Sequence, residues 1–183
     1  MLKLLIPAFV LAATAAHAQA PAHEDGPGPN MVIEVADAAG TAKGTIVLDL
    51  LPEKAPGHVE RLVTLAKQGA YDGVVFHRVI DGFMAQTGCP QGTGMGGSGK
   101  KLKAEFNKEP HVRGTASMAR AANPDSGDSQ FFICFDDASF LNGQYTVWGK
   151  VTEGMENVDK IKRGEPVQNP DKIVKARMAA DAA

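Results

Sequence analysis

Apolar and polar residues alternate with a period of two in eight short segments of the chain beyond residue 30. Such alternation is typical of strands that bury one face. In residues 45–50, Ile46, Leu48 and Leu50 fall on one face, and the opposite face is expected to be wetter, as an antiparallel sheet permits. The predicted strands cover residues 31–35, 44–50, 74–80, 84–87, 115–119, 130–135, 146–151 and 172–178.

Two segments have the period of an α-helix instead. The first follows Pro52 and Pro56, has its apolar residues at i, i+3, i+4 and i+7 from Val59, and is expected to stop at Gly69. The second covers residues 153–163 and ends at Gly164. Two helices are too few to cover an eight-stranded sheet, but they suffice to cap the ends of a barrel. We therefore predict a mainly β fold, a closed eight-stranded antiparallel barrel capped by two α-helices.

Residues 1–18 are typical of a secretory signal peptide. A lysine at position 3 precedes an apolar run over residues 4–16, and Ala16 and Ala18 provide the small residues of a cleavage point. The run is shorter than the ~20 residues that cross a bilayer. The predicted organisation is a signal peptide over 1–18, a flexible leader over 19–30, one domain over 31–178 and a tail over 179–183. We expect a periplasmic protein, free of the membrane after signal removal.

Charge and cysteine content exclude several classes of function. Without residues 1–18 the chain loses only Lys3, so its net charge is 18 minus 21, or −3. A mildly acidic chain lacks the basic surface of a nucleic-acid binder. If the chain is exported, Cys89 and Cys134 enter an oxidising compartment. No C-x-x-C motif is present, and the sequence is compatible both with a disulfide between the two cysteines and with two buried thiols. The scattered histidines have no zinc spacing, so no metal or other cofactor is predicted.

A glycine-rich stretch imitates two nucleotide-binding motifs. Gly92, Gly94 and Gly97 fit G-x-G-x-x-G, and residues 94–100 fit G-x-x-x-x-G-K. Lys101 stands where the second motif needs a hydroxyl for magnesium, and neither motif opens an apolar helix. We interpret the stretch as a loop with positive φ angles that allows close backbone approach. Ser129 likewise lacks the glycine of a nucleophile elbow.

One arginine stands among apolar and aromatic residues in FHRVIDGFMAQ, residues 76–86. A guanidinium stays protonated, so Arg78 cannot act as a base, but it has five donors in a fixed geometry. A buried arginine without a neighbouring carboxylate needs a distant partner or a ligand. On a strand, Arg78 shares its face with Ile80, and Gln130 shares its face with Phe132 and Cys134. The aromatic residues of both segments fit either an ordinary core or an apolar pocket with a polar rim.

The chain resembles the cyclophilins, a family of peptidyl-prolyl cis-trans isomerases. The resemblance runs from about residue 31 to residue 178 and rests on FHRVIDGFMAQTG, GTGMGG, AEFN, GTASMARA, DSGDSQFFIC and FLNGQYTVWGKV. It implies an eight-stranded antiparallel barrel with an active groove on its outer surface. It also implies that the family's substrate-contacting positions are Arg78, Phe83, Met84, Gln86, Ala119, Gln130, Phe132 and Leu141, with Gly94 and Ala121 bordering a neighbouring pocket. Among these, Arg78, Phe83 and Gln86 are the expected catalytic residues.

Three substrate-binding positions depart from the pattern of many eukaryotic cyclophilins. Arg120, Phe140 and Tyr145 stand where those proteins have asparagine, tryptophan and histidine, which resembles the bacterial branch of the family. Arg120 still offers its backbone to an extended peptide, but Phe140 cannot provide an indole N–H donor. The ligand preference of this chain should therefore differ there.

The resemblance implies an enzyme that accelerates rotation about X-Pro bonds in folding proteins. Its expected partners are proline-containing polypeptides, and we expect it to be a monomer. The alternative is a peptide-binding chaperone or scaffold with incidental isomerase activity. An oxidoreductase using the two cysteines is a weaker alternative because the chain lacks C-x-x-C.

Overall fold

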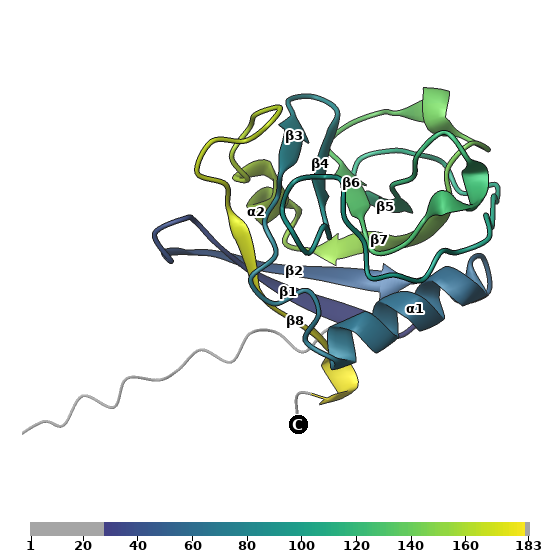
Figure 1. Ribbon diagram of the computed structural model, residues 1–183, viewed down its shortest axis with the longest axis horizontal. Helices are drawn as coiled ribbons and strands as arrows, with labels where there is room; N and C mark the ends of the chain where they lie inside the picture. The colour runs from purple at the N-terminus through teal and green to yellow at the C-terminus, as the bar shows by residue number, and fades with distance from the viewer. Residues whose placement is uncertain (1–27, 182–183) are drawn as a thin grey trace, which may run out of the picture.

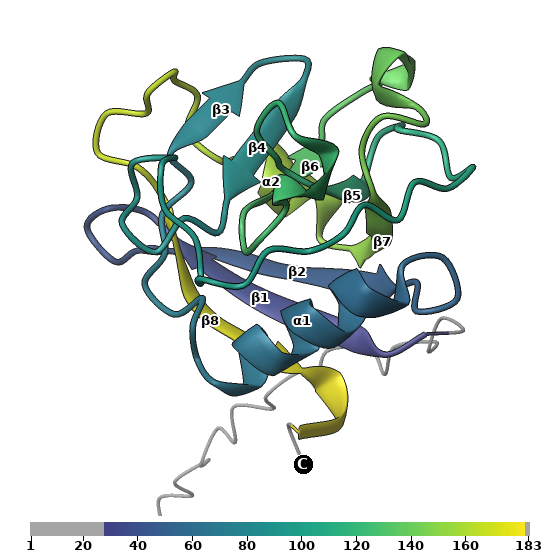
Figure 2. The ribbon, with the colours of Figure 1, turned by 45° about the vertical axis from the view of Figure 1, so that its right-hand side comes forward.

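The computed structural model describes residues 28–181, in which all eight predicted strands form. The strands are β1 (Asn30–Ala36), β2 (Ala42–Leu50), β3 (Arg78–Ile80), β4 (Met84–Thr87), β5 (Thr115–Met118), β6 (Phe131–Cys134), β7 (Val147–Glu153) and β8 (Lys172–Met178). Every pair in the sheet is antiparallel. The sheet curls around an apolar interior (Figures 1 and 2).

The strand order is β3-β4-β6-β5-β7-β2-β1-β8, which leaves β3 and β8 at the two ends. The predicted continuous closure of the barrel is not confirmed, because between these edges the chain forms only an isolated bridge from Val75 to Lys172. β3 is also shorter than predicted. Residues 74–76 leave the β3–β4 ladder to bond to the start of β8, with the N–H of Phe76 2.9 Å from the carbonyl of Asp171.

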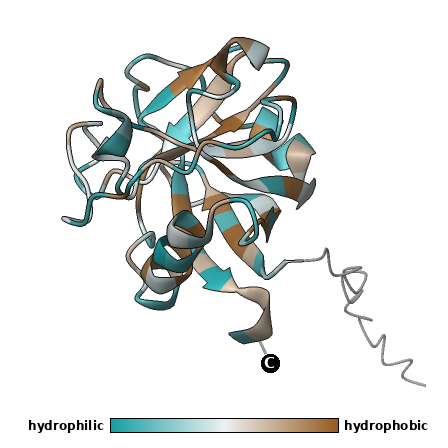
Figure 3. Ribbon diagram, turned by 90° about the vertical axis from the view of Figure 1, so that its right-hand side faces the viewer, coloured by the Kyte–Doolittle hydropathy of each residue, from teal (hydrophilic) through white to brown (hydrophobic). Residues whose placement is uncertain are grey.

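Strand β6 separates two apolar clusters. Phe131 and Ile133 point into the large core, where Phe131 packs edge-to-face on Tyr71 and Trp148. Phe132 and Cys134 point the other way, into a smaller cluster with Met84 and Ala138. Apolar positions gather on the strands (Figure 3), and the two-residue period of β6 places Phe132 on the outer side. The fold thus has a separate apolar surface outside its core.

The face of strand β2 that was expected to be solvent-exposed is more buried than predicted. Ile46, Leu48 and Leu50 lie in the core as expected, but Val47 and Asp49 on the opposite face are buried too. The N–H of Gly28 donates to the Asp49 carboxylate at 3.1 Å. The last residues of the predicted leader therefore cover this face, and Asn30 already belongs to β1. Residues 1–27, with the predicted signal peptide, lie outside the described residues.

Helix α1 (Pro56–Lys67) matches the first predicted helix and packs against β8 (Figure 1). Its N-terminus is capped by Glu105, whose carboxylate accepts the N–H groups of Gly57 and His58 at 2.9 and 3.0 Å. Gly69 ends it with φ +67°. A carboxylate from a distant loop therefore holds the positive end of the helix dipole.

The second helix is shorter than its apolar period predicts. Helix α2 covers only Met155–Asp159: β7 extends to Glu153 and Gly154 adopts φ +80°, so the helix starts later than predicted, and it already ends with Lys160 as its C-cap. Val158 and Ile161 are still buried. Residues 160–171 then form a long connection to β8, and the expected tail starts as a 3₁₀ turn over Ala179–Asp181.

Three buried histidines make the stability of the fold sensitive to acid. Burial lowers the pKa of His58, His77 and His111, and for His58 this effect outweighs the nearby Glu105 carboxylate. The folded protein then binds fewer protons than the unfolded chain near pH 6. The free energy of unfolding should fall as pH drops below about 6.5, by about 1.4 kcal/mol for each unit by which a pKa is lowered.

Urea unfolding at pH 7.5 and pH 5.0 measures this effect. We expect a lower urea midpoint at pH 5.0, and we expect His58→Gln to reduce the difference between the two pH values. A midpoint that is equal at both values, or higher at pH 5.0, would contradict the prediction.

Candidate functional site

The register of three strands aligns Arg78, Gln86 and Phe132 in one row. Arg78 on β3 is opposite Gln86 on β4, and Gln86 is opposite Phe132 on β6. Paired residues of neighbouring strands share one face of the sheet. These side chains therefore lie on the outer face of the curled sheet, next to the small apolar cluster.

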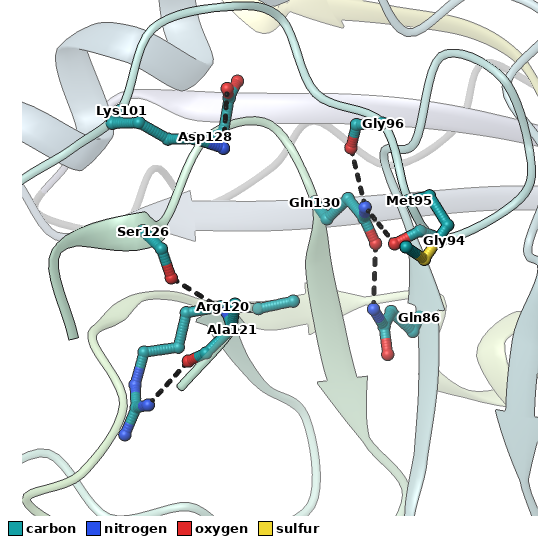
Figure 4. A pocket seen from close by; sticks show the side chains of 11 residues that line it. Gln86, Gly94, Met95, Gly96, Lys101, Arg120, Ala121, Ser126, Asp128 and Gln130 are labelled. Carbon is teal, nitrogen blue, oxygen red and sulfur yellow. Dashed lines mark hydrogen bonds and ion pairs between the residues drawn. The ribbon is translucent and has the colours of Figure 1, made fainter. Parts of the chain in front are cut away.

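A directed chain of hydrogen bonds connects this row to the glycine-rich loop. Arg78 Nη1 donates to Gln86 Oε1 at 3.4 Å, and Gln86 Nε2 donates to Gln130 Oε1 at 3.0 Å. Gln130 Nε2 donates to the carbonyls of Gly94 and Gly96 at 2.9 and 2.8 Å (Figure 4). The two glutamines fix each other's amide orientation, and their oxygens both accept, so Gln86 presents a carbonyl to Arg78.

The arginine is more exposed than its apolar neighbours in sequence suggest. Its side chain keeps 38% of its accessible surface, and its Nε donates to Glu165 Oε1 at 2.5 Å. Glu165 is 87 residues away in sequence. The expected buried guanidinium is thus half-exposed, and its missing carboxylate partner comes from the connection between α2 and β8.

An apolar pocket of about 310 Å³ adjoins Arg78. Phe132 forms a wall of it, backed by His111 at 6.2 Å between ring centroids and flanked by Tyr145 at 5.9 Å. Across from them Phe83 packs on Phe140 at 5.4 Å. We call this the Phe132 pocket; its lining consists of Arg78, Phe83, Met84, Gln86, Ala119, Arg120, Phe132, Phe140, Leu141 and Tyr145.

A second pocket of about 210 Å³ shares the Gln86, Ala119 and Arg120 walls with the first (Figure 4). It contains the predicted Gly94, Ala121 and Gln130. Sequence reasoning missed its other lining residues, which are Met95, Gly96, Lys101, Ser126 and Asp128. All thirteen predicted site residues therefore line one of two adjoining pockets. The missed residues lie in the glycine-rich loop or within the DSGDSQ stretch. Nothing in the sequence alone indicated which residues of these segments face the pocket.

Asp128 supports the rim of the second pocket. Its buried carboxylate accepts the N–H groups of Ser98 and Gly99 at 2.6 and 3.2 Å and lies 3.5 Å from the Lys101 ammonium. Gly92, Gly94 and Gly99 have positive φ angles, as the loop interpretation requires. The loop is therefore held to the site by one carboxylate and by Gln130.

The three departures from the eukaryotic pattern line the first pocket, and Arg120 stands at its border with the second. The Arg120 guanidinium lies 4.5 Å from the ring centre of Tyr145, and its Nη2 donates to the carbonyl of Gln144 at 2.8 Å. Phe140 keeps 65% of its surface exposed at the rim. This border is thus cationic and aromatic.

The remaining candidate residues, which are the described histidines and the two cysteines, lie outside the lining of the two pockets. Within residues 28–181, no three His, Cys, Asp or Glu side chains are grouped as metal ligands. Cys89 and Cys134 are free and buried, and burial raises the pKa of Cys134 to about 12. His77 is buried, and its ring packs next to Gly94. No helix in the described part of the chain is long and apolar enough to span a bilayer.

The arrangement has donors but no nucleophile paired with a base. It consists of a cation, two ordered amides and an apolar pocket of about 310 Å³, which has room for a small ring. Such a site binds a small apolar group and stabilises a developing lone pair or carbonyl beside it.

Comparison with known proteins agrees with this chemistry. Residues 32–178 match the family model for cyclophilin type peptidyl-prolyl cis-trans isomerases. A probable peptidyl-prolyl cis-trans isomerase of Brucella suis is 55% identical over 155 residues, covering 75% of this chain and 79% of that protein. The peptidyl-prolyl cis-trans isomerase of Helicobacter pylori strain 26695 is 51% identical over 133 residues, covering 70% and 81%.

Solved structures agree with the fold. A cyclophilin from Hirschia baltica has a TM-score of 0.75 and 29% identity, with 84% of this chain and 75% of that chain covered. A Cryptosporidium parvum cyclophilin type isomerase, crystallised in the presence of the dipeptide Ala-Pro, has a TM-score of 0.73 and 27% identity, with 81% and 98% covered. The chain described here therefore belongs to the cyclophilins and is a peptidyl-prolyl cis-trans isomerase.

Proposed function

We propose that the Phe132 pocket holds the proline ring of an X-Pro segment and that Arg78 is the catalytic donor. The observation that carries this proposal is the row Arg78, Gln86 and Phe132, which sets one cation directly beside an apolar pocket. A proline ring has no N–H and is apolar, so it suits walls of Phe83, Phe132 and Leu141.

Rotation about an X-Pro bond is slow because amide resonance imposes a barrier of about 18–20 kcal/mol. As the bond twists, the imide nitrogen regains a basic lone pair. An N–H of Arg78 directed at that nitrogen interacts with the twisted state more strongly than with either planar state, and this lowers the barrier. Shortening the isomerisation time from tens of seconds to milliseconds requires a rate increase of about 10⁴-fold. This corresponds to lowering the activation barrier by roughly 5–6 kcal/mol.

Gln86 and Gln130 keep the donor in place. Gln86 Oε1 accepts from Arg78, and Gln130 fixes the orientation of Gln86 through its own bonds to the loop. Oriented donors cost little reorganisation during the twist. The second pocket, with Gly94 and Ala121 on its border, would receive the residues that precede proline.

The test is an X-Pro isomerisation assay, by NMR exchange or coupled proteolysis, on one proline-containing peptide. Wild type and Arg78→Ala are compared at equal concentration of folded protein. Equal kcat/KM for the two proteins would reject the role of Arg78 while leaving the family assignment intact.

We further propose that the protein acts as a monomer on unfolded polypeptides in the periplasm. The lysine, the apolar run and the small residues of positions 1–18 support export. Expressed in full in a Gram-negative host, the chain should be found in the periplasmic fraction and should begin at Gln19 by mass spectrometry. Removal of residues 1–18 should retain it in the cytoplasm. An uncleaved chain in the cytoplasm or in the membrane fraction would contradict export.

A further inference from the structure

The connection between α2 and β8 is paired with strand β3. Val79 and Gly164 exchange two backbone hydrogen bonds, each 2.8 Å long, and the N–H of Val167 donates to the carbonyl of His77 at 3.0 Å. The pairing is antiparallel. Since Val79 lies opposite Gly164, the residue before Val79 lies opposite the residue after Gly164. This register sets Glu165 beside Arg78.

The pairing is anchored on both sides of Glu165. A Cβ at Gly164 would lie 2.7 Å from the Cα of Val167, so the turn accepts only glycine there. Arg163 Nε donates to Asp81 at 3.0 Å, and its guanidinium carbon lies 4.0 Å from the ring centre of Phe135. The position of Glu165 is therefore set by the backbone and by Arg163, independently of its own ion pair.

Glu165 contacts the guanidinium from outside the substrate pockets. Its Oε1 accepts from Arg78 Nε at 2.5 Å, whereas Gln86 Oε1 accepts from Nη1. Arg78 lines the Phe132 pocket and Glu165 lines neither pocket. The two acceptors thus contact different nitrogens of one rigid plane, and together they fix its rotation about the long axis of the side chain.

We propose that Glu165 is a positioning residue for the isomerase, which holds the Nε edge of Arg78 so that the Nη groups face the pocket. The proposal rests on the catalytic role of Arg78 given above. A half-exposed arginine otherwise samples many rotamers, and each excursion withdraws its donors from the twisting bond. The carboxylate acts at the guanidinium edge away from the pocket, so it orients the donor and does not compete with the peptide.

Removing the carboxylate should lower kcat more than it raises KM. We expect Glu165→Ala to reduce kcat by about three- to tenfold with KM changed by less than about twofold, because the donor is used mainly in the twisted state. Glu165→Gln should fall between wild type and Glu165→Ala, since its amide oxygen still accepts from Nε. Both variants are measured by NMR exchange on the same Ala-Pro peptide.

A spectroscopic readout separates positioning from a general structural effect. In ¹⁵N-labelled protein the Nε–Hε signal of Arg78 should exchange slowly with water in wild type and faster in Glu165→Ala. Glu34→Ala is the matched control, because it removes a partly exposed carboxylate that pairs with Arg177 away from both pockets, and it should keep kcat within about twofold. In an Arg78→Ala background, Glu165→Ala should have no additional effect.

Three outcomes would overturn the proposal: unchanged kcat in Glu165→Ala, increased kcat, which would mean that the carboxylate competes with the substrate, or an equal loss in Glu34→Ala. The proposed function fails separately, through unchanged activity of Arg78→Ala. An active-site role of Arg78 with no effect at Glu165 would reject the positioning role alone.

Discussion

Arg78→Ala is expected to lower kcat/KM for an X-Pro peptide by about 10²- to 10³-fold, the loss typical of removing one preorganised donor to a transition state. The fold should survive, because the side chain is half-exposed and its contacts are confined to Gln86 and Glu165 among the interactions described. The free energy of unfolding should change by no more than about 0.5 kcal/mol. NMR exchange gives the rate, and urea unfolding gives the stability.

Arg113→Ala is the matched control for charge and exposure. Arg113 forms an ion pair with Asp159 at 2.6 Å and lines neither substrate pocket, so its loss should leave turnover unchanged. Arg78→Lys keeps the charge but loses the planar fork, and it should recover only part of the activity. A refolding assay with a proline-limited client separates the enzyme from a peptide-binding chaperone, because a pure chaperone would keep its effect in Arg78→Ala.

Phe132→Ala is expected to lower kcat/KM by about 10- to 100-fold and to destabilise the fold by about 3 kcal/mol or more. Phe132 is 5% exposed and contributes both to the smaller apolar cluster with Met84 and to the wall of the Phe132 pocket. Its removal leaves a void between His111 and Tyr145 that a proline ring cannot fill with comparable contacts. Binding is weakened in the planar and twisted states alike. The lower kcat/KM should therefore come mainly from a higher KM, with kcat changed less.

The control for this substitution is Phe106→Ala. Phe106 keeps 43% of its surface exposed and lines neither pocket, so kcat/KM should stay within about twofold. Kinetics must be measured where Phe132→Ala is fully folded by circular dichroism. A folded Phe132→Ala with the wild-type KM would show that the ring belongs to the scaffold and not to the substrate site.

The alternation of apolar and polar residues predicted where the strands form. A strand that buries one face has this two-residue period whichever strands it pairs with. It also placed Phe132 and Cys134 on one face of β6, although it left open whether that face was core or pocket. It failed where backbone geometry prevailed over side-chain period. Gly154 ends β7 and delays the start of α2 to Met155, and residues 74–76 turn from β4 toward β8.

The sequence by itself determined where the strands lie and, through its resemblance to the cyclophilins, the family and the thirteen predicted site residues, all of which line the two pockets. This was possible because strand period and the spacing of motifs are local properties, and because the motifs of this site are contiguous. Only the tertiary structure decided which distant groups meet: Glu105 at the start of α1, Asp128 beneath the glycine-rich loop and Glu165 beside Arg78. These contacts depend on strand register and on how the connections cross the sheet. Both are set by the packing of the whole chain, which no local pattern records.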